Sequence, residues 1–139
     1  DVSCGPRAYL RGGAHFHDRS KAGTHVELKG TEVGAGSKVP HLSYLGDARL
    51  GSGVNIGGGT ITCNYDGKHK SRTEIGDHVF IGSDVMLVAP VTIGDNALVG
   101  AASCITKDVP AGALSLERSR QLTQRGWADA YWKRLEEED

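Results

Sequence analysis

The chain has 139 residues, the length of a single domain, and its formal net charge of −1 gives no electrostatic reason to expect nucleic acid or a membrane surface as a partner. No apolar stretch reaches the ~20 residues that a membrane-spanning helix needs. Twenty glycines and only 6% aromatic residues suit a repetitive solenoid better than a compact globule. The three cysteines have no metal-ligand spacing and favour a reduced, cytoplasmic protein.

Residues 1–32 are basic and contain recurrent turn residues, such as Gly5-Pro6 and Gly12-Gly13, but few regularly spaced apolar residues. We interpret them as early coils of a solenoid with a blurred repeat. From Val33 the chain divides into hexads, VGAGSK, VPHLSY, LGSGVN and IGGGTI, with a five-residue step, LGDAR, before the third. We interpret that step as a variation at one corner of the same solenoid.

The repeat is interrupted over residues 62–74. This segment, TCNYDGKHKSRTE, is polar, contains the turn pair Asp66-Gly67 and lacks the aliphatic spacing of its neighbours. Insertions into solenoids form loops on one face, which is often the binding face. A loop that projects from one corner is therefore predicted here.

Six consecutive hexads run from Ile75 to Pro110, and each begins with an aliphatic residue. A period of six fits neither an amphipathic helix nor a half-buried strand. It is typical of a parallel β-helix in which three hexads form one triangular coil and the aliphatic residues stack in a narrow interior. Glycine follows most of these residues and suits corners, which need a positive φ or close backbone approach. The first residues of the hexads are Ile75, Ile81, Leu87, Ile93, Val99 and Ile105. Two residues before each of the last five lies a small or β-branched residue: Val79, Val85, Val91, Ala97 and Ser103.

The composition changes after the repeats, so we divide the chain into a β-helix over 1–112 and a tail with a helix over 113–139. The segment from Leu116 to Asp139 is rich in charge and free of proline. Its aromatic and apolar residues recur at helical spacing, which predicts an amphipathic helix that covers the open end of the solenoid. These residues are Trp127, Tyr131, Trp132 and Leu135.

Polar residues that the repeat does not require identify a candidate site around His41. Histidine can accept a proton near neutral pH, and Asn55 follows it by somewhat less than one coil, which predicts that both lie near one groove. Tyr44 could help to orient a hydroxylated substrate. The remaining candidates of this group are Asn64, Tyr65 and Lys70 in the loop, and Arg11 and Lys29, which would suit a phosphate.

Four segments give the sequence a specific resemblance: HLSYLGDA, NIGGGTITCNYDGKHK, IGSDVMLVAPVTIG and TKDVPAGAL. They resemble the C-terminal half of bacterial bifunctional glucosamine-1-phosphate acetyltransferase/N-acetylglucosamine-1-phosphate uridyltransferases. The resemblance, which covers about 120 residues, implies an all-β, left-handed parallel β-helix. It also implies homotrimers with active sites between subunits, and small-molecule substrates with no nucleic acid or membrane partner.

The activity implied by the resemblance is acetyl transfer from acetyl-CoA, as a co-substrate, to the amine of glucosamine-1-phosphate. This reaction is a step towards UDP-N-acetylglucosamine for peptidoglycan and lipopolysaccharide, and no metal is expected. His41 matches the catalytic base. Substrate contacts match Arg11, Lys29, Tyr44, Asn55 and Lys70, and acetyl-CoA contacts match Gly58, Asn64, Tyr65, Ser83, Ala101 and Arg118.

The sequence also departs from the family pattern. Gly58 replaces a usual alanine, which keeps the backbone N–H that is our candidate donor to the oxyanion. Trp127 lies where some relatives bring an aromatic residue from a neighbouring subunit, although helix packing explains it as well. The chain begins without Met and contains no nucleotide-binding segment, so we expect an excised acetyltransferase domain without magnesium-dependent uridyl transfer.

Three other interpretations stay open. One is an acyltransferase of the same fold with a different acceptor, although three cations would have no use against a neutral acceptor. Another is a zinc β-helix hydratase, because the six histidines could supply three ligands across an interface. A non-catalytic scaffold would leave HLSY and NYDG unexplained.

Overall fold

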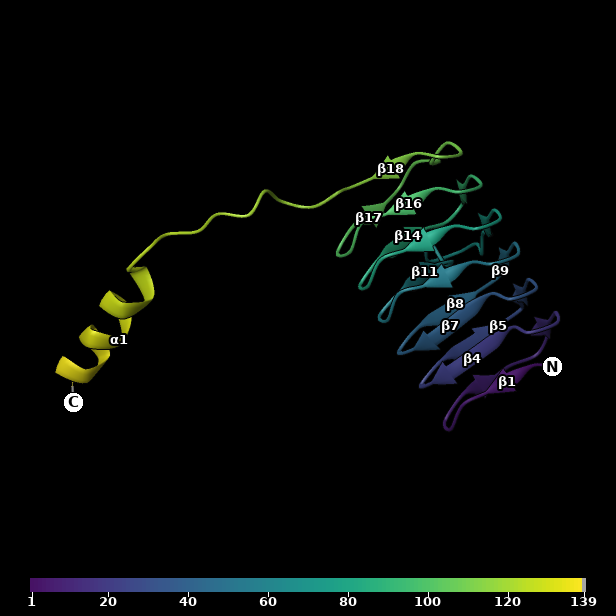
Figure 1. Ribbon diagram of the computed structural model, residues 1–139, viewed down its shortest axis with the longest axis horizontal. Coiled ribbons are helices and arrows are strands. Elements are labelled where there is room, and N and C mark those ends of the chain that lie inside the picture. Colours follow the sequence, from purple (N-terminus) through teal and green to yellow (C-terminus); the bar gives the residue numbers. More distant parts are fainter. Residues whose placement is uncertain (139) are drawn as a thin grey trace.

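A computed structural model describes residues 1–138 as a stack of triangular coils followed by an extended segment and one helix (Figure 1). Each coil contributes one strand to each of three parallel sheets, which we call faces A, B and C. Face A contains β1 (Ser3–Cys4), β4 (Lys21–Thr24), β7 (Lys38–His41), β10 (Asn55–Ile56), β13 (Phe80–Ile81), β16 (Leu98–Val99) and β18 (Leu114–Ser115).

Face B follows face A along each coil, and face C completes it. Face B contains β2 (Tyr9–Leu10), β5 (Glu27–Lys29), β8 (Tyr44–Gly46), β11 (Ile61–Cys63), β14 (Met86–Val88) and β17 (Cys104–Ile105). Face C contains β3 (His15–Phe16), β6 (Glu32–Val33), β9 (Ala48–Leu50), β12 (Thr73–Ile75) and β15 (Val91–Ile93). The predicted all-β, left-handed parallel β-helix with a projecting loop and a C-terminal helix is confirmed. Residues 1–32 form regular coils, as predicted.

The hexad pattern identifies the interior correctly. Ile81, Leu87, Ile93 and Val99 are fully buried, and Ile75 and Ile105 are nearly so. The residues two positions before them are buried as well, from Val79 to Ser103. Burial of each large aliphatic side chain contributes about 1.5–3 kcal/mol, so the stacked aliphatic residues stabilise consecutive coils against one another.

The glycines that follow the aliphatic residues serve close backbone approach. A Cβ atom on Gly82 would lie 2.4 Å from the backbone nitrogen of Ala101 in the next coil. The positive φ angles occur two residues later in the hexad, at 56° for His78, 55° for Asp84 and 57° for Asn96. The sequence suggests two reasons for glycine at corners, a positive φ or close backbone approach. At this position the reason is close backbone approach.

The projecting loop covers residues 64–72 and is narrower than the predicted 62–74. Cys63 still pairs with Val88 in the next coil, and Thr73 pairs with Ala48 and Val91. Thr62 is buried, which explains why it stays in the strand although it is polar. The loop leaves the β-helix at the corner between faces B and C, and this corner becomes important at the candidate site.

The C-terminal helix α1 (Trp127–Glu137) has no buried residue, so the prediction that it covers the end of the solenoid is wrong. Figure 1 shows an extended segment after β18 that carries α1 away from the coils. The aromatic residues instead pack within the helix, with the rings of Trp127 and Tyr131 stacked at a centroid distance of 5.3 Å. Asp139, the last residue of the predicted segment, lies outside the described residues. Helix α1 is too short and too polar to cross a membrane. The division at residue 112 stays a prediction, and the last strand lies just beyond it.

Candidate active site

One corner of the β-helix collects four of the candidate residues. His41, Gly58, Ser83 and Ala101 each occupy the third position of a hexad, and they follow strands β7, β10, β13 and β16 of face A or end them. In consecutive coils they therefore line the corner between faces A and B. All four also line a groove of about 440 Å³ that runs along face A. The structure thus brings these separate sequence positions together at one corner.

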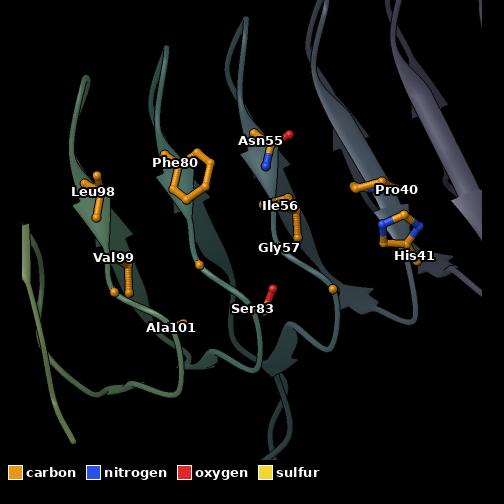
Figure 2. A pocket seen from close by; sticks show the side chains of 13 residues that line it. Pro40, His41, Asn55, Ile56, Gly57, Phe80, Ser83, Leu98, Val99 and Ala101 are labelled. Atoms are coloured by element: carbon orange, nitrogen blue, oxygen red, sulfur yellow. The ribbon is translucent and has the colours of Figure 1, made fainter.

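The wall of this groove is a row of side chains in register on face A. Asn55 pairs with Lys38 on one side and with Phe80 on the other, and Phe80 pairs with Leu98. Figure 2 shows Asn55, Phe80 and Leu98 side by side on neighbouring strands. The predicted proximity of Asn55 and His41 is confirmed, because both line the groove. Phe80 is 49% exposed, so the groove offers an apolar wall beside a polar end.

His41 ends strand β7 and is exposed at the polar end of this groove. The Ser43 hydroxyl donates to the backbone oxygen of His41 at 2.9 Å, which fixes the backbone that carries the imidazole. Within residues 1–138, the ring nitrogens of His41 have no hydrogen-bond partner. The imidazole is therefore able to accept a proton from a molecule bound in the groove.

Among the residues that the structure describes, one of the backbone N–H groups at this corner has no acceptor, although its neighbours do. The neighbouring Gly57 and Gly59 donate to Ile81 and Leu42, and the Gly58 oxygen accepts from Asp84 at 2.8 Å. The Gly58 N–H itself has no acceptor within the described part of the chain. A fixed backbone donor that has no acceptor is suited to stabilise a developing oxyanion.

Arg118 reaches this corner from the extended C-terminal segment. One of its guanidinium nitrogens donates to the backbone oxygen of Ala101 at 2.7 Å. This contact places a permanent positive charge at the end of the groove that is distant from His41.

A second group of candidate residues lies on face B and at the corner between faces B and C. Lys29 donates to one carboxylate oxygen of Asp47 at 2.7 Å, and the Asn64 amide donates to the other at 2.8 Å. The same amide nitrogen lies 3.4 Å from the Tyr44 hydroxyl. Asn64 is buried, while Lys29, Tyr44 and Asp47 are half-buried. These four side chains form one hydrogen-bonded cluster.

The charge state of Asp47 follows from its neighbours. Burial acts to raise the pKa of the Asp47 carboxyl, but the hydrogen bonds from Lys29 and Asn64 and the charges of Lys29 and Lys70 outweigh it, so the pKa lies below its ordinary value. The hydrogen bond to Asp47 raises the pKa of Lys29 in turn, against the opposing effect of burial. Both groups are therefore charged at neutral pH.

Arg11 lies beside this cluster on face B and is paired as well. Its guanidinium donates to Glu27 at 2.9 Å, and this hydrogen bond raises the pKa of Arg11. Tyr44 is in register with Glu27 on the neighbouring strand. Arg11 and Lys29, the two cations predicted to suit a phosphate, thus share one face, and each is balanced by a carboxylate.

The projecting loop is an ordered hairpin. Tyr65 and Lys70 face each other in an antiparallel bridge, and Ser71 donates to the backbone oxygen of Asn64 at 2.9 Å. At the tip, backbone N–H groups of Lys68 and His69 donate to Asp66, which lowers the pKa of its carboxyl. Lys70 is exposed on this hairpin, and Tyr65 is 60% exposed.

The candidate residues thus form two groups on different faces of one chain. The turn at residues 41–43 separates His41 and Asn55 from Tyr44, Asn64 and Lys70, which sequence proximity had placed in one cluster. Two carboxylates in the second group, Glu27 and Asp47, were missed by the sequence analysis. Asp47 could have been found from its spacing, because Gly13, Gly30 and Asp47 are equally spaced along the chain. In the structure all three share one corner and a positive φ, which is 51° for Asp47.

The chemistry that this arrangement supports is proton transfer and charge stabilisation. It offers an imidazole, a free backbone donor and paired cations. Within residues 1–138, no three His, Cys, Asp or Glu side chains come together in one chain to hold a metal ion.

Comparison with known proteins agrees with this fold. Residues 72–107 match the model of the bacterial transferase hexapeptide family (six repeats). Over 120 residues, or 86% of the chain, the sequence is 63% identical to the bifunctional protein GlmU of Heliobacterium modesticaldum. It is 57% identical over 127 residues, or 91% of the chain, to the bifunctional protein GlmU of Trichlorobacter lovleyi. The chain spans about a quarter of these relatives, 26% and 28% of their lengths.

A solved structure shows the same fold at lower identity. The acetyltransferase domain of PglB from Neisseria gonorrhoeae, in complex with acetyl coenzyme A, superposes with a TM-score of 0.74 at 21% identity, covering 86% of this chain and 57% of that one. Residues 72–107 are thus similar to the hexapeptide-repeat transferases, and most of the chain is similar to the part of bifunctional GlmU proteins that it covers.

Proposed function

We propose that the protein transfers the acetyl group of acetyl-CoA to the amine of glucosamine-1-phosphate and so forms N-acetylglucosamine-1-phosphate. The observation that carries this proposal is the corner at which His41 lies next to Gly58, whose N–H has no acceptor within the described residues, in a groove that is open along face A. The high identity to GlmU proteins supports the choice of substrates.

The first group of residues takes acetyl-CoA. Ser83, Ala101 and Arg118 follow the groove away from His41, and a long extended co-substrate fits a groove that spans several coils. The apolar side chains of Phe80 and Leu98 contact its aliphatic arm. Arg118 supplies positive charge for a phosphate. Asn64 and Tyr65, which belong to the second group at the base of the loop, reach the acetyl group from a neighbouring copy of the chain.

The second group takes the sugar phosphate. Arg11, Lys29 and Lys70 hold the phosphate through charge-assisted hydrogen bonds. Tyr44 from the second group and Asn55 from the first orient the sugar ring so that its amine points at His41. Positioning of the two reactants at one corner supplies much of the rate enhancement, because it replaces an encounter in solution by a reaction between neighbours.

The transfer needs no covalent intermediate on the protein. The amine nitrogen attacks the thioester carbonyl carbon while His41 removes a proton from that nitrogen. The carbonyl oxygen becomes an oxyanion, which the Gly58 N–H stabilises. The tetrahedral intermediate then collapses, the carbon–sulfur bond breaks, and the CoA sulfur leaves and takes up a proton. No metal takes part in this sequence.

Both groups belong to one site when copies of the chain assemble as a homotrimer. Face A with its groove and face B with its cations are separate in one chain, and a neighbouring copy brings one against the other. In Figure 1 helix α1 lies away from the coils, and Trp127 at its start is exposed. A contribution of Trp127 to a neighbouring site is therefore part of the same proposal. The cytoplasmic location stays a prediction.

Release of free CoA tests the function directly. The assay uses acetyl-CoA with glucosamine-1-phosphate and unphosphorylated glucosamine as parallel acceptors. We expect strong release with the phosphorylated sugar alone. Equal release with both acceptors would support an acyltransferase that does not recognise the phosphate. No release by a folded trimer would contradict the enzymatic proposal.

A further inference from the structure

Asp47 is unusual among the residues at its corner. In the two preceding coils the corner between faces B and C is formed by glycines, Gly13 and Gly30, with positive φ angles of 81° and 57°. Asp47 has the same kind of backbone conformation, with a φ of 51°. Glycine adopts this conformation freely, whereas a side chain disfavours it. The position therefore carries a carboxylate where glycine would satisfy the backbone.

The Asp47 carboxylate lies between a residue of the β-helix, Lys29, and a residue of the loop, Asn64. One oxygen accepts from Lys29, and the other accepts from Asn64. Lys29 belongs to the β-helix, while Asn64 is the first residue of the hairpin loop. The Asp47 backbone oxygen also accepts from Thr73, just after the loop, at 3.3 Å. Asp47 thus contacts both ends of the loop and the β-helix beneath it.

The surrounding backbone leaves space for this contact. A Cβ atom on Gly46 would lie 2.3 Å from the Tyr44 hydroxyl oxygen and 2.4 Å from the Asn64 amide nitrogen. A Cβ atom on Gly30 would lie 2.9 Å from the carboxylate of Asp47. The two glycines on either side therefore make room for the cluster of Tyr44, Asp47 and Asn64.

We propose that Asp47 is a positioning residue that couples the phosphate-binding lysine Lys29 to the loop residue Asn64, so that the sugar phosphate and the acetyl group are held in a fixed relation. This inference rests on the proposed function for its two substrates. Its chemical basis is that a carboxylate accepts two donors, whereas an amide of the same shape offers one acceptor oxygen. Asp47→Asn therefore removes one of the two contacts without changing the size of the side chain.

The test measures steady-state kinetics of acetyl transfer by Asp47→Asn together with two matched variants. Glu27→Gln removes the partner of Arg11 only, and Asp77→Asn changes an exposed corner carboxylate that accepts from the backbone of Ser52 at 2.7 Å. We expect Asp47→Asn to raise KM for glucosamine-1-phosphate and to lower kcat, each by about tenfold or more, as for lost hydrogen bonds to a charged group. Glu27→Gln should raise KM alone, and Asp77→Asn should change neither value.

Hydrogen exchange of the loop separates this inference from the proposed function. Asp47→Asn should speed exchange in peptides that cover 64–72, including the Ser71 amide, whereas Glu27→Gln and Asp77→Asn should not. Inactive wild-type protein that shows this exchange pattern would contradict the acetyl transfer and retain the coupling. Active protein in which Asp47→Asn leaves loop exchange and both kinetic constants unchanged would overturn the coupling alone. Equal losses of stability in Asp47→Asn and Asp77→Asn, without a kinetic difference between them, would also overturn it.

Discussion

A methyl group on Gly58 would lie 3.5 Å from the imidazole Cδ2 of His41, because the two residues occupy the same corner of consecutive coils. This separation is an ordinary van der Waals contact. The φ of Gly58 is not positive, so an L side chain suits its backbone. The position where the family usually carries alanine is therefore compatible with alanine here.

Gly58→Ala is predicted to stabilise the protein by about 0.4–1 kcal/mol, because alanine reduces the conformational entropy of the unfolded chain. Acetyl transfer should be retained, since the backbone N–H is unchanged. Gly57→Ala is the matched control, because its Cβ would lie 2.3 Å from the Gly82 carbonyl carbon and should destabilise the coils. Urea unfolding of both variants measures the difference. Equal destabilisation by the two substitutions would contradict the geometry of this corner.

His41→Ala is predicted to lower kcat for acetyl transfer by about 10²–10⁴-fold, the usual contribution of a general base. The side chain is exposed, so the unfolding free energy should change by no more than about 0.5 kcal/mol. His15→Ala, an exposed histidine on face C, is the control and should retain full activity. Retention of most of the activity by His41→Ala would require another base.

The periodicity predicts the interior well because it reports directly on burial. The first residues of the hexads from Ile75 to Ile105 are all aliphatic and all buried, because they face the interior between coils. The loop is bounded less accurately, since Thr62 and Thr73 are polar and yet buried in strands. A prediction based on aliphatic residues therefore assigns both threonines to the loop.

The site is predicted in its members and not in its arrangement. His41 and Tyr44 are three residues apart, but a corner between them places them on different faces. Their distance in the sequence does not show that the chain turns there. Asp47 was missed because its importance depends on contacts with Lys29 and Asn64, which lie 18 and 17 residues away. The role of α1 was mispredicted because amphipathic spacing shows that a helix has an apolar side and not what covers it.

Arg11→Ala is predicted to raise KM for glucosamine-1-phosphate by about 10- to 100-fold with a smaller effect on kcat, because a hydrogen bond to a charged group contributes about 1.5–3 kcal/mol. The KM of the wild-type protein for this acceptor should also rise with salt, since exposed charges are screened. Arg19→Ala, an exposed cation at the corner between faces C and A, serves as the control. An unchanged KM in Arg11→Ala would remove Arg11 from the phosphate site.

The depressed pKa of Asp47 predicts how stability depends on pH. A carboxyl whose folded pKa lies below its unfolded value of about 3.9 stabilises the fold above that pH, and the contribution is lost as the pH falls through the folded pKa. Wild-type protein should therefore be more stable than Asp47→Asn at pH 6, and the difference should shrink below about pH 3.9. Thermal unfolding of both proteins, from pH 6 down to strongly acidic solution, measures this difference in stability. A difference that is constant with pH would show that the Asp47 carboxyl titrates alike in both states.

Removal of the helix is predicted to leave the β-helix as stable as before. No residue of α1 is buried, and its aromatic rings contact one another. A chain that ends at Gln121 keeps every strand and Arg118, so its unfolding free energy should stay within about 0.5 kcal/mol of the full chain. A larger loss, measured by urea unfolding at equal concentration, would show that α1 packs on coils, its own or those of a neighbouring copy. If stability is unchanged but acetyl transfer falls, and Trp127→Ala in the full chain reproduces the fall, the aromatic end of α1 acts at the site of another copy and not in the folding of its own.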